Sequence, residues 1–458
     1  MSTITDYSER QSSGTVLIVA MWVVLVLAGL ALVFARAMRV EVGAAANQVA
    51  GLQADAVAQA AVQFVLSQVD NTPPQQRGHY TPDPSVSFEG VQVGDGYFWI
   101  LNPGLDDDRA YSFGIRDEAS RINLNSATTD MLLKLPNVTA EMAAAIMDWR
   151  DGDSDVSPGG AESEYYLLLP DPYYCKNAPF ETVEEILSVR GASPQFLFGE
   201  DTNHNGVLDA NENDAADTDP PDNRDGHLDR GILDYVTVHS QEPNQGPSAA
   251  ARINVNDSNL QPLSALLRAA VSQDQYFRVM DLVRRGRPFR NVLDFYVKTG
   301  LTAAEFAQIA DQITTSREEN LVGLVNVDTA PRAVLLCLPG LEESDVDALL
   351  AKRQSPDTDL TNVAWVGDAL TREKAVAAGD LITTRSYQFS VDIVAVSANG
   401  RAFRRYRAIV DATTTPPRVI YWKDLTHLGW PLAPAILASL RAGESVVASV
   451  GPSVAGGQ

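Results

Sequence analysis

Residues 15–35 read TVLIVAMWVVLVLAGLALVFA and contain no charged side chain. At about 1.5 Å of rise per residue, a helix of this length matches the roughly 30 Å hydrocarbon core of a bilayer. The segment therefore predicts a membrane-spanning helix. The alternative is a secretory signal peptide, which has a shorter apolar region but could use Ala35-Arg36-Ala37 as its cleavage site. Arginines lie on both sides of the segment, so their distribution does not fix its orientation.

The helix is predicted to continue to about residue 69, because no proline occurs before Pro73. In its second half, apolar residues recur in steps of three and four at Met38, Val42, Ala45, Val49, Leu52 and Ala56. This spacing places the six side chains on one helical face, which we expect to pack against a sheet. A helix that is apolar all round and then amphipathic resembles the spine of a type IV pilin.

Two stretches far apart in the sequence are predicted to form one sheet. The first lies within residues 81–121 and includes the run VQVGDGYFWIL at 91–101. The second is a hairpin of residues 386–396 and 401–411, joined by Ser397-Ala398-Asn399-Gly400. Asn-Gly is a strong hairpin signal because both residues tolerate positive φ. The intervening residues would form an inserted domain, which their composition marks as mainly helical.

This insert contains an internal repeat. Residues 123–150 align without a gap to residues 326–353, so that Pro136 falls on Pro339, and a partial third copy begins at residues 252–256 (RINVN). Each copy predicts a helix capped by Asn or Asp, a Leu-Pro turn and a second helix. Such an αα-hairpin buries its apolar faces only by stacking on neighbours.

These hairpins resemble the helix-hairpin-helix modules that bind DNA. Those modules hold a phosphate with free backbone N–H groups at a glycine-rich turn. Here the turn at residues 135–139 has no glycine, and the turn at residues 339–343 carries Glu342 and Glu343 at the phosphate position. Thirty-five Lys and Arg against 59 Asp and Glu give a net charge of −24, which repels phosphate backbones. DNA binding therefore remains only as a less favoured alternative.

An acidic stretch between residues 200 and 234 carries the register of a calcium loop. Positions 1, 3, 5, 6, 7, 9 and 12 are occupied by Asp201, Asn203, Asn205, Gly206, Val207, Asp209 and Glu212. In such a loop alternate oxygens converge on one ion, glycine permits the sharp turn, and the last carboxylate can bind bidentately. A weaker second set comprises Asp217, Asp219, Asp222, Asp225 and Asp229. Prolines after the loop argue against a sensor EF-hand, so we predict a structural Ca²⁺ site.

The sequence offers no catalytic motif: it has no Gly-x-Ser-x-Gly elbow, phosphate loop, dinucleotide fingerprint or His-Glu-x-x-His. We therefore expect no enzymatic activity. Cys175 and Cys337 allow at most one disulfide, and the sequence leaves their pairing open. Residues 431–458, rich in Ala, Ser, Val and Gly, are expected to form a loose tail.

The amino terminus resembles that of prepilin-like proteins. A short polar leader ends at Gly14 and the apolar helix begins at Thr15; in those proteins a prepilin peptidase cuts after the glycine and the new first residue is N-methylated. Val19 stands at the fifth mature position, where most pilins and pseudopilins carry Glu. A carboxylate in a bilayer is kept only with a partner, so its absence suggests a special place in the filament. The missing Glu and the large body are similar to the general secretion pathway protein K family, minor pseudopilins of the type II secretion system.

Further motifs of that family's helical domain occur in the same order in this chain. They are residues 122–125 (INLN), 135–136 (LP), 148–151 (DWRD), 160–162 (GAE) and 177–180 (NAPF). The resemblance extends over about residues 10–430.

The resemblance implies an α+β, pilin-like fold: a long N-terminal helix packed on an antiparallel sheet, with a large inserted, mainly α-helical domain containing helix-hairpin-helix-like repeats. The expected divisions are a leader at 1–14, the transmembrane half of the helix at 15–36, the pilin-like helix and first strands at 37–118, the insert at 119–385 with its calcium loop at 200–234, a completing β-hairpin at 386–430, and the tail at 431–458.

The implied function is that of a minor pseudopilin at the pseudopilus tip, together with minor pseudopilins I, J and H. It would initiate and cap assembly for the export of folded proteins across the outer membrane. Its body would lie in the periplasm on a single-pass bacterial inner-membrane anchor, after processing by a prepilin peptidase, and would contact the secretin and exported proteins. The alternative is a calcium-stabilised, membrane-anchored periplasmic binding protein unrelated to secretion.

Overall fold

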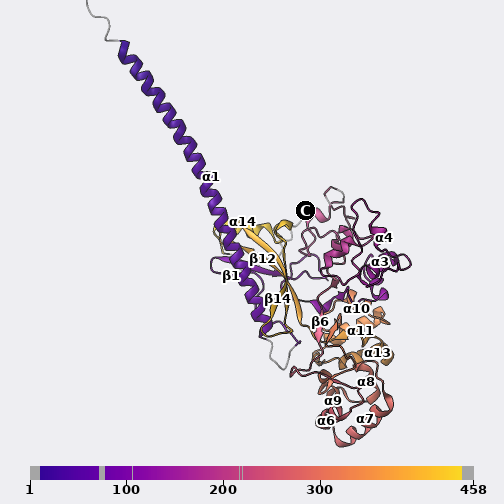
Figure 1. Cartoon of the computed structure of the whole chain (residues 1–458). Coiled ribbons are helices and arrows are strands. Elements are labelled where there is room, and N and C mark those ends of the chain that lie inside the picture. Colours follow the sequence, from indigo (N-terminus) through magenta and orange to yellow (C-terminus); the bar gives the residue numbers. More distant parts are fainter. Residues whose placement is uncertain (1–10, 72–77, 106, 216, 219, 446–458) are drawn as a thin grey trace, which may run out of the picture.

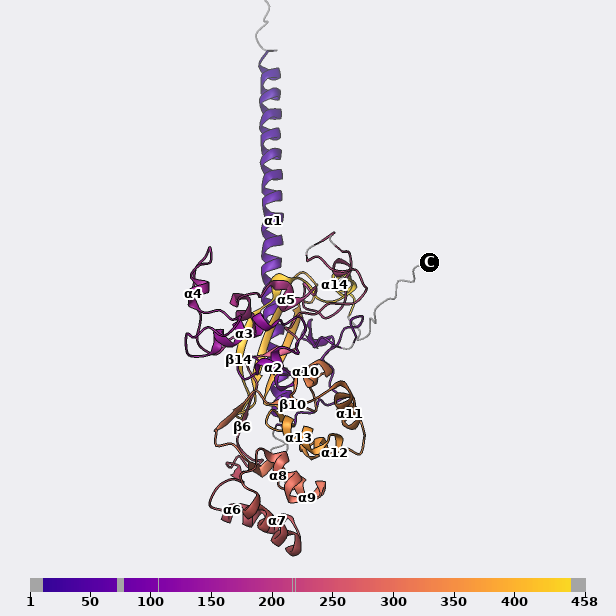
Figure 2. The same cartoon turned by 90° about the vertical axis from the view of Figure 1, so that its right-hand side faces the viewer.

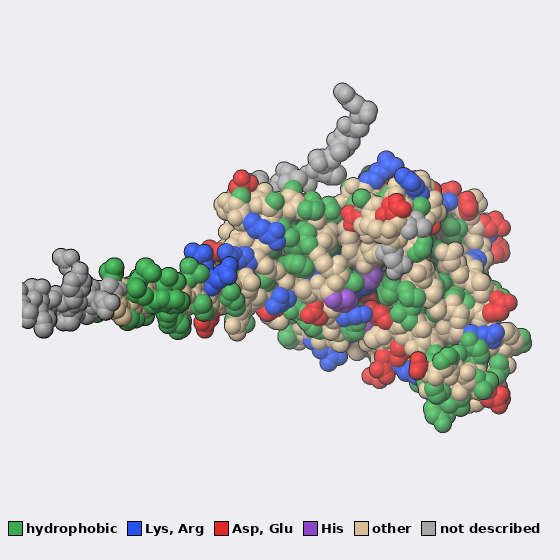
Figure 3. Space-filling model, turned by 90° about the horizontal axis from the view of Figure 1, so that it is seen from above, with side chains coloured by type: hydrophobic (Ala, Val, Ile, Leu, Met, Phe, Trp, Pro, Cys, Tyr) green, Lys and Arg blue, Asp and Glu red, His purple; other side chains and the backbone are tan. Residues whose placement is uncertain are grey.

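A computed structural model describes residues 11–71, 78–105, 107–215, 217–218 and 220–445. Helix α1 (Gln11–Asp70) begins far outside the body and ends within it (Figure 1). Its part from Thr15 onwards is the one helix in the described residues that is long and apolar enough to cross a membrane. The projecting part of α1 is covered with apolar side chains, whereas charges of both signs are scattered over the body (Figure 3).

The second half of α1 packs on an antiparallel sheet. Its buried side chains are Ala50, Ala54, Val57, Ala58, Ala61, Val62, Val65 and Val69. The prediction of which helical face packs on the sheet is wrong. The residues predicted to face the sheet are all exposed: Met38, Val42, Ala45, Val49, Leu52 and Ala56. At 100° per residue the two sets lie on nearly opposite sides of the helix. Both are apolar, so the spacing alone could not tell the sheet-facing stripe from the other.

The sheet has six strands, in the order β1-β2-β12-β13-β14, with β3 also paired to β12. Their bounds are β1 (Val91–Val93), β2 (Gly96–Leu101), β3 (Arg116–Asp117), β12 (Gln388–Val396), β13 (Phe403–Asp411) and β14 (Arg418–Asp424). All pairs are antiparallel, and Ile100 of β2 lies opposite Ile393 of β12. The predicted pairing of the two distant β segments is thus confirmed, and the run 91–101 is itself a hairpin.

Helix and sheet approach closely and are joined by hydrogen bonds to Asp55. A Cβ on Gly96 would lie 2.6 Å from Val57 Cγ2, so only glycine allows α1 to approach β2. Asp55 of α1 accepts hydrogen bonds from Arg404 Nε at 2.7 Å and from the Tyr406 hydroxyl at 2.9 Å, both on β13. This contact fixes α1 relative to the sheet.

The opposite sheet face is apolar at one end and polar at the other. Tyr97, Trp99, Val394 and Val396 form a cluster with Leu432 and Leu440, and Leu440 belongs to α14 (Pro434–Ala442). The first part of the expected loose tail is therefore a packed segment, because its Leu residues are long enough to cover the sheet. Residues 446–458 lie outside the described residues.

Residues between β3 and β12 build three copies of one supersecondary unit, which lie beside and beyond the sheet (Figure 2). Each copy opens and closes with a short parallel strand pair. The pairs are β4 (Ile122–Asn123) with β5 (Val236–Thr237), β7 (Ile253–Asn254) with β8 (Ile313–Thr314), and β10 (Val325–Asn326) with β11 (Ile382–Thr383). A further antiparallel pair, β6 (Gln241–Pro243) with β9 (Asn320–Val322), flanks the middle copy.

Helices fill the three copies. The first contains α2 (Thr129–Leu132), α3 (Ala140–Arg150), α4 (Ser163–Tyr166) and α5 (Pro194–Phe198); the middle one contains α6 (Gln261–Ala270), α7 (Gln273–Gly286), α8 (Val292–Thr299) and α9 (Ala303–Ala307); the last contains α10 (Arg332–Cys337), α11 (Glu343–Arg353), α12 (Ala364–Ala369) and α13 (Arg372–Ala378). Short 3₁₀ helices lie at Glu118–Ser120, Val183–Ser188, Ala210–Glu212, Ala310–Gln312 and Thr426–Leu428.

The first and last copies of the repeat share an arginine contact. The sequence alignment matched these arginines but not what they bind. Arg150 and Arg353 each reach back to backbone carbonyls at the start of their own copy, Arg353 to Ala330 at 2.8 Å. The predicted Asn caps are wrong, because Thr128 and Thr139 cap α2 and α3. Asn123 instead donates its side-chain amide to Ser240 O at 3.1 Å, so it ties the start of the copy to the segment after its closing strand.

Candidate functional site

The predicted calcium register lies in a closed loop of the first copy. Gly199 lies where the two ends of this loop meet. The Glu200 N–H donates to the Asp229 carbonyl at 2.8 Å. Gly199 has φ 66°, and a Cβ there would lie 2.1 Å from that same carbonyl oxygen. Glycine is therefore required for the two ends of the loop to close.

Asp201, at position 1 of the register, organises the first half of the loop. Its carboxylate oxygens accept the backbone N–H groups of Asn205 at 3.1 Å and Gly206 at 2.9 Å. Asn203 Oδ1 accepts the Asn205 N–H at 2.9 Å, and Asn205 Oδ1 accepts the Val207 N–H at 2.7 Å. Gly206 makes the sharp turn with φ 73°. These hydrogen bonds coil the loop from Asp201 to Val207.

The second half of the register folds back onto the first. Asp209 Oδ2 accepts the side-chain amides of Asn203 at 2.6 Å and Asn205 at 3.1 Å. Glu212 accepts the Thr202 N–H at 2.9 Å through Oε1 and the Asp209 N–H at 3.1 Å through Oε2. Positions 3, 5 and 9 thus meet directly, and position 12 returns to the beginning of the loop.

Two carboxyl groups of this loop, Asp201 and Glu212, are buried, and the hydrogen bonds that they accept offset the cost of burial only in part. Burial, with Glu212 and Asp234 nearby, raises the pKa of Asp201 to about 7, and Arg230 offsets this only in part. Burial likewise raises the pKa of Glu212. Buried carboxylates are costly in the ionised form unless a cation neutralises them.

The donor chemistry of the loop suits calcium. Three carboxylates (Asp201, Asp209, Glu212), two side-chain amides (Asn203, Asn205) and the Val207 carbonyl supply only oxygen ligands, the type that Ca²⁺ prefers. Among the described residues, no group of three or more His, Cys, Asp or Glu side chains is placed to hold a metal ion, so the three carboxylates of the loop do not converge as a cluster in this structure. The residues fit calcium by donor type and register.

The weaker second set is only partly assembled. Asp217 is exposed, and Asp219 lies outside the described residues. Asp222 accepts backbone N–H groups from Asp214 at 2.8 Å and Arg224 at 2.7 Å, and Asp225 accepts that of His227 at 2.8 Å. These contacts shape a turn rather than a cluster.

Glu200 contacts Asp229 of the weaker set, although neither predicted ligand set includes it. It accepts the N–H groups of Asn223 at 3.3 Å and Asp229 at 3.1 Å, while Asn223 Nδ2 donates to Asp229 Oδ2 at 3.0 Å. Burial, together with Asp229, raises the pKa of Glu200. Glu200 precedes the first register by one residue, so periodic spacing gave no signal for it.

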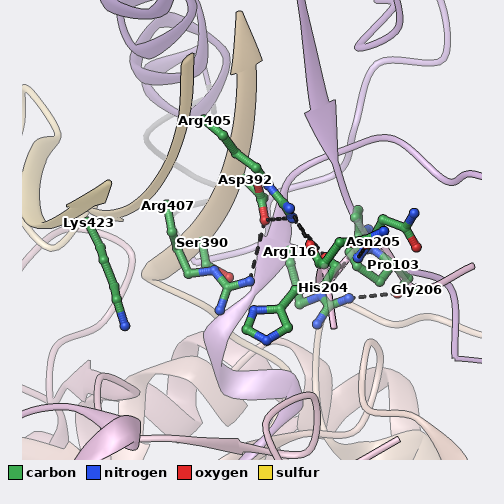
Figure 4. A network of polar contacts seen from close by, with 12 residues as sticks. Pro103, Arg116, His204, Asn205, Gly206, Ser390, Asp392, Arg405, Arg407 and Lys423 are labelled. Atoms are coloured by element: carbon green, nitrogen blue, oxygen red, sulfur yellow. Dashed lines mark hydrogen bonds and ion pairs between the residues drawn. The ribbon is translucent and has the colours of Figure 1, made fainter. Parts of the chain in front are cut away.

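The polar end of the sheet faces the loop that carries the predicted calcium register (Figure 4). Arg405 of β13 is fully buried and pairs with Asp392 of β12 through Nε at 2.9 Å and Nη2 at 2.8 Å. The same guanidinium donates to the backbone carbonyls of Asn203 and His204, the latter at 2.9 Å. Sequence reasoning missed Arg405, because alternation in β13 identifies an inward position but not what it contacts.

Other contacts join the loop region to its surroundings. Asn205 Nδ2 donates to the Pro431 carbonyl at 2.9 Å, and Arg230 donates to the Gly206 carbonyl at 2.8 Å. Nearby, Lys423 of β14 forms an ion pair with Glu184 at 2.7 Å. The loop thus lies between the sheet, the C-terminal segment and the rest of the insert.

The predicted processing residues lie in the projecting part of α1. Gly14 falls within the helix, while Thr15 and Val19 are exposed on it. The preceding leader residues 1–10 lie outside the described residues.

Cys175 and Cys337 are both free and buried. Burial raises the pKa of Cys175 to about 11 and that of Cys337 to about 12. Each thiol donates to a backbone carbonyl, Cys337 to Ala333 O at 3.2 Å. The structure contains no bridge between them, which answers the question that the sequence left open.

Comparison with known proteins identifies one family. Residues 120–197 match the family described as type II secretion system protein K. This match includes all five family motifs noted above, and most of α5. It confirms the resemblance stated from the sequence.

A chain of the GspK-GspI-GspJ complex from the enterotoxigenic Escherichia coli type 2 secretion system aligns with a TM-score of 0.42 and 12% identity, over 81% of this chain and 96% of that chain. No curated protein matches the sequence.

Proposed function

We infer that this chain is a protein K of the type II secretion system and acts as one of its minor pseudopilins. The observation that carries this inference is the family match over residues 120–197. Protein K is a structural component of secretion, and we propose no catalytic role for any residue.

The architecture supports a pilin-like reading of the body. A helix with a projecting apolar half and a packed second half lies on an antiparallel sheet. The insert leaves this sheet after β3 and returns before β12. A pilin-like subunit carrying a helical insert describes this arrangement.

The exposed stripe of α1 (Met38, Val42, Ala45, Val49, Leu52 and Ala56) suits packing against other helices. It continues the apolar surface of the membrane segment on the side away from the sheet. Apolar residues spaced in steps of three and four are what a neighbouring helix needs for ridges-into-grooves contact. We assign this stripe to the helices of minor pseudopilins I and J, and we propose H as a further partner.

The bulk of the insert favours a place at the tip. The middle copy, with α6 to α9, lies at the end of the body opposite the projecting start of α1 (Figures 1 and 2). In a filament built by stacking N-terminal helices, a body of this size would collide with subunits above it. At the tip it would instead face the secretin and exported proteins, and could begin and cap the pseudopilus.

Processing and location follow from the amino terminus. A prepilin peptidase removes residues 1–14 and leaves an N-methylated Thr15 at the start of the apolar helix. This helix anchors the chain once in the bacterial inner membrane, with the body in the periplasm. Because Val19 carries no charge, it needs no amine of a neighbouring subunit to neutralise it, unlike the Glu usual at this position. This suits a subunit at the tip, which has no subunit above it.

Calcium stabilises the insert as a structural ion. Asp201, Asn203, Asn205, the Val207 carbonyl, Asp209 and Glu212 would hold it. The support is the donor set and the burial of Asp201 and Glu212. A cation bound only by the native state increases its stability by mass action.

Co-expression with a prepilin peptidase and with minor pseudopilins I and J tests the proposal. Intact-mass analysis should show a chain starting at methylated Thr15, and a tag on pseudopilin I should retain both this chain and pseudopilin J. An unprocessed chain, or one cut near Ala37, that is not retained would contradict the proposal. It would leave a membrane-anchored periplasmic binding protein as the better description.

A further inference from the structure

Arg405 is a charged side chain where the sheet would ordinarily be apolar. It lies on the same face of the sheet as Val394, which is opposite it in the register, and it has no exposed surface. A buried ion pair such as Arg405 with Asp392 gives little net stability, because desolvation offsets most of the attraction. Stability alone therefore gives a weak reason for a charge here.

The Arg405 guanidinium pairs with Asp392 and also donates hydrogen bonds to the loop. While Nε and Nη2 pair with Asp392, Nη1 donates to the Asn203 carbonyl and Nη2 also to the His204 carbonyl. The planar group thus joins one strand pair to two consecutive residues of the loop (Figure 4). A lysine could not reproduce this geometry, since it carries its donors at a single point.

The two carbonyls belong to the part of the loop that must be held in position. Asn203 occupies position 3 of the register, so fixing its backbone also directs its side-chain oxygen. His204 has φ 55°, a left-handed conformation that non-glycine residues seldom adopt, and its ring stacks on Phe198 at 4.7 Å between centroids. External contacts are needed to maintain such a backbone.

We propose that Arg405 is a positioning residue for the calcium loop, through which ion binding and docking of the insert on the sheet favour each other. This rests on the calcium proposal above. The loop is held by the sheet at Asn203 and His204, and by the C-terminal segment through Asn205. A loop held in this way loses less conformational freedom on binding an ion. By linkage, the bound ion must strengthen the same contacts by an equal factor.

Calcium titration of the full-length chain in detergent, after removal of ions by chelation, tests this. Arg405→Lys should weaken Ca²⁺ binding on the order of tenfold, as is typical when a group supporting a metal ligand is changed. The matched control is Arg404→Lys, which lies one residue away on the opposite sheet face and contacts Asp55 of α1; it should bind Ca²⁺ as the unaltered chain does.

A double variant separates positioning from the loss of a buried charge. Arg405→Met with Asp392→Leu removes both partners of the fully buried ion pair. Arg407 Nη2, which also pairs with Asp392 at 3.4 Å, loses that contact, but its side chain is 22% exposed and can be solvated. It should keep the fold but lose Ca²⁺ affinity, and hydrogen exchange of residues 201–212 should become faster in the Ca²⁺-loaded protein. A purely structural ion pair would change thermal stability equally with and without Ca²⁺.

The outcomes distinguish the two proposals. Ca²⁺ affinity unchanged in both Arg405 variants would overturn the positioning role and leave the calcium site intact. If the unaltered chain shows no Ca²⁺ binding, the calcium proposal fails, and the positioning role fails with it.

Discussion

Asp117, at the end of β3, accepts a hydrogen bond from Ser386 at 2.5 Å, and so joins the point where the chain leaves the sheet to the point where it returns. The same carboxylate accepts the side-chain amide of Asn326 at 3.1 Å and the Thr329 hydroxyl at 2.5 Å. Burial raises its pKa to about 6. One side chain thus ties the last copy of the insert to the sheet.

Replacing Asp117 by Leu should destabilise the chain by about 3 kcal/mol, because several buried donors would lose their acceptor. Ser386→Ala removes only one of these donors and should cost about 1 kcal/mol. Denaturant unfolding of the full-length chain measures both. Similar values for the two variants would show that Asp117 is not the centre of this junction.

Asp328 gives the clearest pH dependence. Burial raises its pKa to about 8, although Trp365 Nε1 donates to its Oδ1 at 3.1 Å. The folded chain therefore binds this proton more tightly than the unfolded chain, whose carboxyl titrates near pH 3.9. Its contribution to stability decreases as the pH rises from about 4 to about 8.

Asp328→Asn keeps an acceptor for Trp365 and removes this titration. We expect the variant to be more stable than the unaltered chain by about 1 kcal/mol or more at pH 8, with the advantage shrinking towards pH 5. Melting temperatures measured at the two pH values check this. An advantage that is equal at both would exclude the titration of Asp328 as its cause.

Both thiols should resist modification in the folded chain, because Cys175 and Cys337 are buried and their pKa values are raised by that burial. Maleimide should add nothing to the native protein and two groups after unfolding without reductant, as read by intact mass. Unfolded chain that takes up maleimide only after reduction would instead indicate a disulfide.

The sequence predicted the broad fold because its strongest signals are local. The apolar run at 15–35, the absence of proline before Pro73 and the Asn-Gly turn at 399–400 each specify one element by themselves. The two β segments then pair in one sheet over the helix, as predicted.

What the sequence did not predict depends on contacts between distant residues. The sheet-facing side of α1 is chosen by Gly96, which admits Val57, and by the contact of Arg404 with Asp55. In the candidate site, the register located the loop ligands, but Glu200 and Arg405 enter through contacts with residues that no spacing connects to them. The sequence also did not reveal that the turn at residues 135–139 has a left-handed residue without glycine, since Asn137 adopts φ 59° where Gly340 adopts φ 75° in the other copy.

Removal of the predicted ion should destabilise the insert. At Ca²⁺ concentrations about 100 times the dissociation constant, binding adds about 2.7 kcal/mol of stability, so chelation should lower the melting temperature measurably. Glu212→Gln, which removes a ligand charge but keeps an acceptor for the Asp209 N–H, should abolish most of this Ca²⁺ response. Glu373→Gln on α13 is the control, because it lies outside the loop. A chelator effect that persists in Glu212→Gln would place the ion elsewhere.

The exposed stripe of α1 should decide partner binding without affecting the fold. Val49 and Leu52 are 54% and 63% exposed, so changing either to Glu costs little in the isolated chain but would place a charge between packed helices in a complex. We expect Val49→Glu and Leu52→Glu to lose retention by tagged pseudopilin I while their melting temperatures stay within a degree or two. Asn47→Glu is the matched control: it adds the same charge at an exposed site about half a turn away from the stripe. Loss of retention in all three variants would point to general charge repulsion, and retention of all three would exclude this face as the contact with pseudopilins I and J.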